Sequence, residues 1–228
     1  MQVIWLKKKE LIPVAIRAIY PVEVLLDIGC GIVPQNYVLP KVHICCEPFA
    51  EYVVYLNKKI AALDACDRSY VVIKMGWSEA VRCFPEKSVD SIFLLDVIEH
   101  LEKEEGRVLL AQTEKIAKRQ IVIFTPLGFM PQHHPDGKDA WGLNGGNWQE
   151  HKSGWLPEDF IGEEWQCFAS NEFHTVDNLG NILAPPHGAL WAIKTYGRKE
   201  KKHHNLLFSW IERKVTGILT KICRKLLF

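Results

Sequence analysis

The 228-residue chain lacks the patterns that define several large classes of protein. No apolar run approaches the roughly 18 residues that a membrane-spanning helix needs. Its seven cysteines form no Cys-x-x-Cys pair, so the sequence predicts neither a disulfide framework nor a zinc site. The first ten residues lack the small-residue cleavage site of a secretory signal. Together these absences favour a cytosolic globular protein.

Composition and charge exclude further classes. Hydrophobic residues make up 48% of the chain and charged residues 24%, which is ordinary globular usage and excludes a disordered protein. Residues 198–228 hold nine of the 28 Lys and Arg but two of the 27 Asp and Glu. The first 197 residues therefore carry 19 basic and 25 acidic groups, a net charge of about −6. That balance argues against a nucleic-acid-binding surface on the main domain.

The C-terminal segment 198–228 has the pattern of a separate basic amphipathic helix. Apolar residues from Leu207 to Leu226 recur at helical spacing, and lysines and arginines are interleaved with them. Two interpretations remain open. The helix lies on an anionic membrane surface, which would place the protein at a membrane, or it packs on its own domain or in a dimer. The sequence does not indicate an oligomeric state.

Residues 1–197 alternate short β-branched apolar runs with longer segments of helical spacing. This alternation predicts an α/β domain, a mostly parallel sheet with helices on both faces. The expected strands are 24–28, 42–47, 70–75, 89–95 and 120–125, with two closing strands at 165–172 and 189–196. The expected helices are 11–19, 49–63 and 102–117, with a further helix beginning at Pro157.

Residues 126–156 form a long irregular segment that we expect to be a loop on the substrate side of the domain. Residues 126–155 contain six glycines, three histidines and three tryptophans. Long structured loops beyond a strand's carboxyl end are where α/β proteins keep substrate contacts. Trp141, Trp148 and Trp155 are either structural side chains, in the core or in a lid, or a surface on which a flat acceptor stacks, and the structural interpretation is favoured.

The turn after the first expected strand has the pattern of a nucleotide site without a pyrophosphate. Gly29 and Gly31 allow close backbone approach to a ligand, and the next segment can open a helix. Glu47 follows Gly29 by 18 residues, near the spacing at which an acid reaches ribose hydroxyls. Neither a third glycine nor a phosphate loop follows. Asp27 suits a ligand with an amino group and a positive centre.

From about Val24 to Thr125 the sequence resembles the class I S-adenosylmethionine-dependent methyltransferases, in particular the type 11 subgroup. Three segments carry the resemblance: Asp27 to Gly31, Glu47, and the block from Ser88 to Leu101, which contains Asp-Val-Ile-Glu-His-Leu. The family implies a Rossmann-like, doubly wound sheet of seven strands with an antiparallel last strand. It also implies S-adenosyl-L-methionine as cofactor. The residues expected to contact it are Asp27, Gly29, Cys30, Gly31, Glu47, Pro48, Gly76, Trp77, Asp96 and Val97.

The resemblance also assigns roles within this set. The two glycines would pack against the methionine part of the cofactor, with Asp27 near its amino group. Glu47 would bind the ribose hydroxyls, and Asp96 and Val97 would line the methyl region. The acid that often meets the adenine amine is missing after Gly76, so Trp77 is expected to stack on the adenine.

Transfer of the methyl group to a hydroxyl requires a base, and histidine suits this role near neutral pH. The candidates are His100, His133 and His134. Glu99 and His100, with the other two histidines, also have the residue types of a divalent-metal site. We favour the simpler interpretation that the Glu-His pair fixes a helix start, so no metal is expected.

The function predicted from the sequence is methyl transfer from S-adenosylmethionine to a small-molecule acceptor, at oxygen. Two alternatives stay open. One is a nicotinamide-dependent oxidoreductase on a related fold, against which the missing third glycine counts. The other is a cofactor-binding scaffold without catalysis. The acceptor itself is not indicated, because a fold does not fix a substrate.

Overall fold

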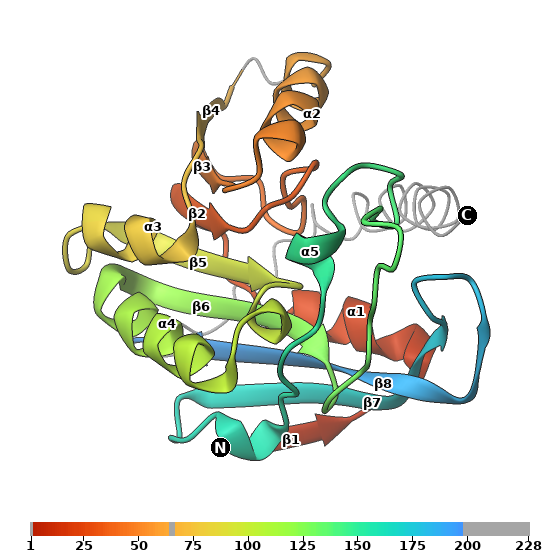
Figure 1. Ribbon diagram of the computed structural model, residues 1–228. Helices are drawn as coiled ribbons and strands as arrows, with labels where there is room; N and C mark the ends of the chain where they lie inside the picture. Colours follow the sequence, from red (N-terminus) through yellow and green to blue (C-terminus); the bar gives the residue numbers. More distant parts are fainter. Residues whose placement is uncertain (1, 64–66, 198–228) are drawn as a thin grey trace. The chain divides into compact units, whose positions relative to one another are not determined.

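The computed structural model describes residues 2–63 and 67–197, and its centre is an eight-stranded sheet (Figure 1). The strands lie in the order β1-β7-β8-β6-β5-β2-β3-β4. β8 runs antiparallel to both of its neighbours, and the other neighbouring pairs are parallel. The strands are β1 Gln2–Trp5, β2 Val24–Ile28, β3 Val42–Cys46, β4 Ser69–Ile73, β5 Val89–Leu95, β6 Ala117–Pro126, β7 Trp165–Val176 and β8 Ile182–Thr195.

The expected α/β class and the antiparallel last strand are confirmed, and the sheet has one strand more than expected. The additional strand, β1, is four residues long and pairs with β7 at the edge of the sheet. β1 is short and its two end residues are exposed, so the sequence shows too little apolar pattern to predict this strand. β7 and β8 also extend further than expected, as a long hairpin around residues 177–181.

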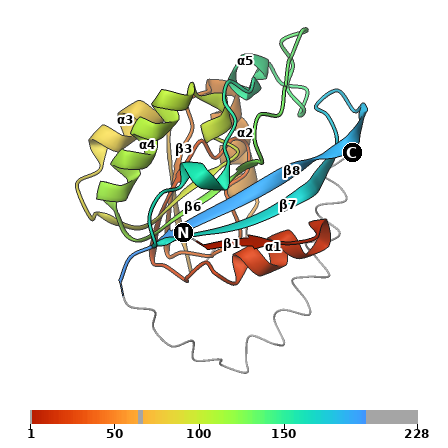
Figure 2. The same cartoon turned by 90° about the horizontal axis from the view of Figure 1, so that it is seen from below.

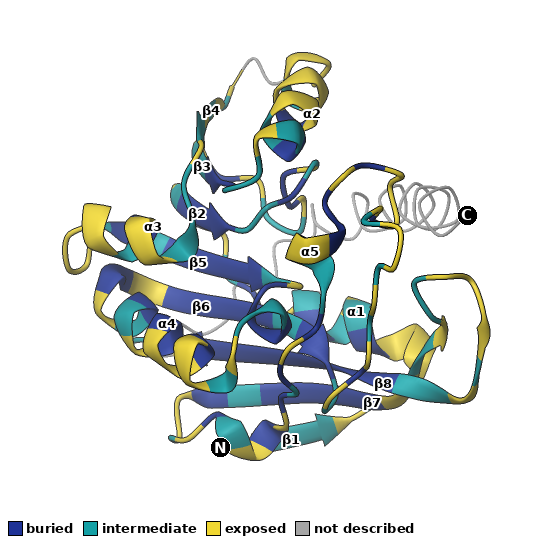
Figure 3. Ribbon diagram, viewed as in Figure 1, coloured by how far each residue is buried: buried dark blue, intermediate teal, exposed yellow. Residues whose placement is uncertain are grey.

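Helices cover both faces of the sheet, as Figure 2 shows for α1 on one side and α3 and α4 on the other. Successive strand residues point to opposite faces. Leu25 and Phe93 therefore pack with Leu11 of α1, while Leu26 and Ile92 pack in the core beneath α4. Buried residues are concentrated on the central strands (Figure 3). The helices are α1 Lys8–Ile16, α2 Ala50–Ala61, α3 Trp77–Cys83, α4 Lys103–Ile116 and α5 Gly146–Gln149, with 3-10 turns η1 Ile98–His100 and η2 Pro157–Asp159.

The segment after β2 was expected to open a helix, and this expectation is wrong. Residues 29–41 contain turns and bends but no helix. Pro34 and Pro40 interrupt the segment, and proline in a helix interior costs about 3 kcal/mol. The side-chain carbonyl of Gln35 instead accepts hydrogen bonds from the backbone N–H groups of Tyr37 and Val38. A ligand at the glycine turn therefore meets loop amides rather than a helix start.

Pro157 begins a 3-10 turn of three residues instead of the helix that was expected there. Asp159 accepts a hydrogen bond from the backbone N–H of Leu156 and pairs with Lys103 of α4 at 2.6 Å. This contact holds the end of the long loop against α4.

Trp155 fixes the long loop to the sheet and to α4. Its side chain is fully buried, and it lies against Gly106, where an added Cβ would be 2.4 Å from the indole ring. Its backbone bridges to Leu127 and Gly128, just after β6. Trp155 is therefore a core residue and the anchor of residues 127–155.

We expect Gly106→Ala to lower the free energy of unfolding by about 1–3 kcal/mol, because a buried ring must move to admit the methyl group. Alanine is the better helix former by about 1 kcal/mol, so a gain in stability would show that Trp155 does not press on α4. The control is Val108→Ala on the same helix, where the side chain is 52% exposed and little should change. Urea denaturation of the three proteins measures both effects.

The expected basic helix of residues 198–228 lies outside the described residues, so the proposed domain boundary after residue 197 and the membrane or packing role of the segment stay predictions. Within the described ranges no helix has both the length and the apolar character needed to cross a membrane.

Candidate active site

A cavity of about 450 Å³ opens at the carboxyl ends of β2, β3, β5 and β6. Its volume lies in the range of small-molecule sites, and the location is the usual one in α/β sheets. All ten residues expected to contact the cofactor line it, as does His100. The long loop closes one side, with lining residues Met130, Gln132, Trp141, Trp148, Gln149 and His151.

The glycine turn lies against the loop that follows β5. Gly29 has a φ of 71°, and a Cβ there would lie 2.8 Å from Cγ2 of Val97. The turn therefore needs glycine at this position both for its left-handed backbone and for space. The N–H of Gly29 donates to the carbonyl of Cys46 at 2.8 Å, which joins the turn to the end of β3. Two strand ends are thus held together at the cavity floor.

Glu47 follows β3 and is 4% exposed. Its Oε2 accepts a hydrogen bond from the N–H of Gly31 at 2.9 Å, and its Oε1 accepts one from the N–H of Phe49 at 2.9 Å. Burial raises the pKa of Glu47, and these two hydrogen bonds act in the opposite direction. Each carboxylate oxygen has a second acceptor site, so the side chain can still receive two hydroxyl groups from a ligand.

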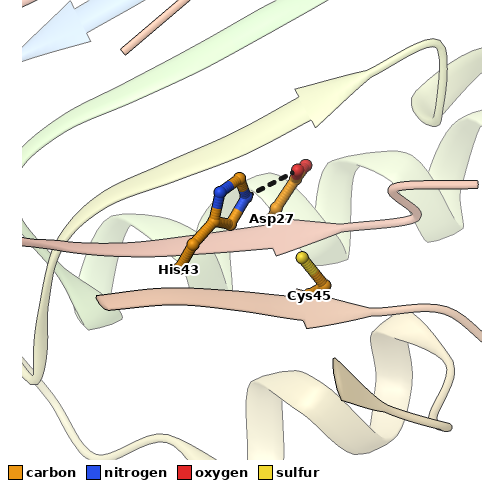
Figure 4. A group of neighbouring side chains, drawn as sticks. All are labelled: Asp27, His43 and Cys45. Atoms are coloured by element: carbon orange, nitrogen blue, oxygen red, sulfur yellow. Dashed lines mark hydrogen bonds and ion pairs between the residues drawn. The ribbon is translucent and has the colours of Figure 1, made fainter. Parts of the chain in front are cut away.

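Asp27 belongs to a buried network that the sequence did not predict (Figure 4). Its Oδ2 lies 3.0 Å from Nε2 of His43 on the neighbouring strand and accepts the N–H of Gln35 at 3.1 Å. Burial lowers the pKa of His43, but hydrogen bonds to Asp27 and Cys45 raise it to about 9. His43 is therefore charged near pH 7 and pairs with Asp27. This pairing occupies part of the carboxylate that was expected to meet the cofactor's amino group.

Pro48, Gly76 and Trp77 form another wall of the cavity, at the ends of β3 and β4. Trp77 is the first residue of α3, a short helix that the sequence pattern did not predict. Glu79 accepts a hydrogen bond from the N–H of Gly76 at 3.0 Å and so fixes the start of this helix. The indole of Trp77 is half-buried and available to a flat ring.

Asp96 and Val97 follow β5, and Asp96 has the left-handed φ of 52°, uncommon for a residue other than glycine. Its N–H donates to the carbonyl of Phe124 at 2.9 Å, so the strained position is held by β6. Its side chain is exposed in the cavity. Backbone strain of this kind concentrates at functional sites.

His151 is a cavity residue that the sequence pattern did not predict. Its ring lies against that of His100, with centroids 5.0 Å apart. Burial lowers the pKa of His100 to about 4, and burial also lowers the pKa of His151. Both rings are therefore neutral near pH 7. No sequence spacing links two residues 51 positions apart, which is why the pair was not predicted.

His133 and His134 do not line this cavity. They border a separate hollow with Pro135, Gly146, Asn147 and Glu150. His133 is 71% exposed at the side chain and lies 3.3 Å from Glu150, and Nδ1 of His134 lies 2.6 Å from the carbonyl of Lys138. Of the three predicted catalytic histidines, the structure places His100 alone in the cavity.

The three tryptophans of the long loop divide between the two interpretations left open by the sequence. Trp155 is core, whereas Trp141 and Trp148 are 43% and 49% exposed and line the cavity. Tyr52 of α2 donates its hydroxyl to Asp139 at 2.5 Å and so ties the loop to α2. The site is therefore bounded by flat aromatic surfaces on the loop side.

Comparison with known proteins gives structural but not sequence relatives. No protein-family model and no curated protein sequence matches the chain. The structure is similar to the small RNA methyltransferase HEN1, with a TM-score of 0.51 and 16% identity over 86% of this chain and 26% of that one. The structure is also similar to a methyltransferase from Archaeoglobus fulgidus, with a TM-score of 0.49 and 16% identity over 82% of this chain and 94% of that one. A third similar structure is the cyclopropane synthase MmaA2 from Mycobacterium tuberculosis, with a TM-score of 0.42 and 22% identity. The match covers 52% of this chain and 42% of the length of that one.

The strand order of this chain also supports a methyltransferase fold, without reference to a particular similar structure. Without the edge strand β1, the sheet has seven strands, six of them parallel, with the antiparallel β8 inserted between β6 and β7. Seven mostly parallel strands with an antiparallel last strand are what the resemblance in the sequence implied. The chain therefore has the fold of the class I S-adenosylmethionine-dependent methyltransferases.

Proposed function

We propose that the protein transfers the methyl group of S-adenosylmethionine to an oxygen atom of a small-molecule acceptor. The observation that carries this proposal is the content of one cavity. It gathers two groups of residues: the glycine turn with the Glu47 carboxylate and the exposed Asp96, and the imidazoles of His100 and His151. The first group has the donors and acceptors that an aminoacyl nucleoside requires, and the second is available to an acceptor.

The charge of the cavity favours a sulfonium ligand over a pyrophosphate. Among the described residues that line it are the carboxylates of Glu47 and Asp96, and that of Asp27, which pairs with His43, but no lysine or arginine. Carboxylates repel phosphate and stabilise a positive centre. This supports S-adenosylmethionine and counts against the nicotinamide dinucleotide of the alternative oxidoreductase.

Methyl transfer from a sulfonium is an in-line displacement, so the protein's main task is to position two reactants and to exclude water. The methyl carbon forms a bond to the acceptor oxygen as its bond to sulfur breaks, and the acceptor hydroxyl gives up its proton. His100 and His151 are the side chains at the acceptor end that can take part in this step. Trp141 and Trp148 would enclose the reactants and offer stacking surfaces to a flat acceptor.

A small acceptor fits both the cavity volume and the charge of the domain. The net charge of about −6 on residues 1–197 would repel a polynucleotide backbone. HEN1 is a small RNA methyltransferase, and this chain matches 26% of it. An RNA acceptor would need a basic surface that the acidic balance of these residues does not favour.

The test combines ligand titration with a transfer assay. Calorimetry should show binding of S-adenosylmethionine and no binding of NAD. The protein is then incubated with methyl-labelled S-adenosylmethionine and fractionated extract of the source cell, and a fraction that gains label is analysed by mass spectrometry. Label should appear on a small molecule that has gained the mass of one methylene unit. Binding without transfer to any fraction would favour the scaffold, and binding of NAD alone would favour the oxidoreductase.

A further inference from the structure

We propose that Glu99, His100 and His151 bind a divalent transition-metal ion at the acceptor end of the cavity. One potential ligand atom from each residue lies within 4.8 Å of those of the other two. Glu99 and His100 come from η1, just after β5, and His151 comes from the long loop. The sequence pattern includes the Glu99–His100 pair as possible metal ligands, but His151 was not among the candidate residues and no metal was expected.

Backbone carbonyls fix the tautomer of both histidines. Nδ1 of His100 lies 3.2 Å from the carbonyl oxygen of Glu150, and Nδ1 of His151 lies 2.6 Å from that of Met130. A carbonyl only accepts hydrogen bonds, so each neutral ring carries its hydrogen on Nδ1 and keeps the lone pair on Nε2. Metal-binding histidines almost always show this arrangement, in which the second ring nitrogen donates to a carbonyl or a carboxylate.

Glu99 supplies a buried carboxylate with one oxygen unused. The residue is 1% exposed, and its Oε2 accepts a hydrogen bond from the hydroxyl of Thr125 at 3.1 Å. Its Oε1 is buried and has no hydrogen-bond partner among the described residues. The Asp96 carboxylate lies close enough to interact with this side chain, and a buried carboxylate next to a second one is costly to keep charged, so a cation beside the pair removes that cost. The hydrogen bond from Thr125 to Oε2 would then orient the Glu99 carboxylate toward the metal ion.

The backbone holds His151 next to the Glu99–His100 turn. The carbonyl of Glu99 accepts hydrogen bonds from the N–H groups of Lys152 and Ser153, at 2.7 and 3.1 Å. The three side chains are thus placed by main-chain contacts and do not depend on long flexible side chains. A site of this kind is already assembled before a ligand arrives.

The donor types indicate the class of ion. Two imidazole nitrogens and one carboxylate suit Zn²⁺, Mn²⁺, Fe²⁺ or Co²⁺, whereas Mg²⁺ and Ca²⁺ prefer sites made of oxygen atoms alone. Three protein ligands leave coordination positions free for water or a substrate oxygen. A cation here would bind the acceptor hydroxyl and lower its pKa, a role that rests on the function proposed above.

A second group of potential ligands, Asp27, His43 and Cys45, does not have these properties. All three residues are buried, and Asp27 and His43 already satisfy each other as an ion pair at 3.0 Å. The raised pKa of His43 indicates an imidazolium, which has no lone pair to offer a metal. This group is explained as a structural network beneath the glycine turn.

The experiment measures binding of Mn²⁺ to the full chain, stripped with chelator and free of S-adenosylmethionine, by loss of the electron paramagnetic resonance signal of the free ion. We expect one Mn²⁺ per chain, with binding at least tenfold weaker in Glu99→Gln and in His151→Asn. His133→Ala, which removes an exposed histidine outside the cavity, should bind as the unmodified protein does. Circular dichroism establishes that each variant is folded, and if one histidine variant does not fold, Glu99→Gln decides.

No bound Mn²⁺, or equal affinity in the unmodified protein and in Glu99→Gln, would overturn the metal site. Calorimetric binding of S-adenosylmethionine to the same stripped protein is measured separately and should be retained. Loss of the metal site with cofactor binding intact leaves the proposed function standing. Metal binding without binding of S-adenosylmethionine would contradict the proposed function and leave the metal site standing.

Discussion

Replacing Trp155 with alanine should lower the free energy of unfolding by about 3–5 kcal/mol, the largest effect on stability that we expect from a single substitution in the long loop. The indole is fully buried and packs near Phe160, with ring centroids 6.0 Å apart. Its Nε1 lies within hydrogen-bond distance of the carbonyl of Ile98 and the hydroxyl of Ser153, at 3.1 and 3.0 Å. The substitution leaves a cavity and also removes a donor from buried acceptors.

The same substitution should release the acceptor end of the site. Ser153 and Trp155 both contact the carbonyl of Ile98, in the turn that carries Glu99 and His100. Chemical denaturation measures the stability, and Mn²⁺ binding measures the site. Trp148→Ala is the matched control, because that side chain is 49% exposed and its loss should cost less than about 1 kcal/mol. Equal losses in the two variants would show that Trp155 is not the anchor.

Glu47→Ala should weaken binding of S-adenosylmethionine by at least about a hundredfold. We expect the carboxylate to receive two ribose hydroxyl groups, and each hydrogen bond to a charged group contributes about 1.5–3 kcal/mol. The substitution also removes the acceptors of the Gly31 and Phe49 N–H groups, so the glycine turn loses its support. Both effects act in the same direction, and calorimetric titration measures their sum.

Two further variants serve as a graded change at Glu47 and as a control. Glu47→Gln keeps one acceptor oxygen and the shape of the side chain, so it should fall between the unmodified protein and Glu47→Ala. Glu86→Ala removes an exposed carboxylate outside the cavity and should leave the affinity unchanged. An unchanged dissociation constant for Glu47→Ala would reject the placement of the ribose at this residue.

The parts of the fold that the sequence predicted are those with a strong local pattern. β2 and β5 have the expected bounds, because each is a compact apolar run ended by a turn or a charged residue. β1 and α3 were missed, since four and seven residues are too few to establish a period. The helix expected after β2 is absent because the two prolines outweigh the glycine pattern.

The residues of the site also divide into those that the sequence predicted and those that it did not. The cofactor side depends on strand ends that the sheet brings together, so a resemblance covering β2 to β6 located all of its expected residues on one cavity. His43 was not recognised, because inside a strand it looks like any residue of an alternating pattern. His151 depends on the path of the long loop, which Trp155 determines through contacts with η1 and α4. Contacts between residues more than 50 positions apart leave no local signal in the sequence.

The most direct test of the account is a crystal structure of the protein grown with S-adenosylhomocysteine, the product that the proposed reaction leaves behind. We predict that its ribose hydroxyl groups lie on the Glu47 carboxylate and that its sulfur lies near Asp96 and Val97, facing His100 and His151. A cavity that remains empty at saturating ligand, or an occupant whose phosphates contact Gly31, would contradict the account.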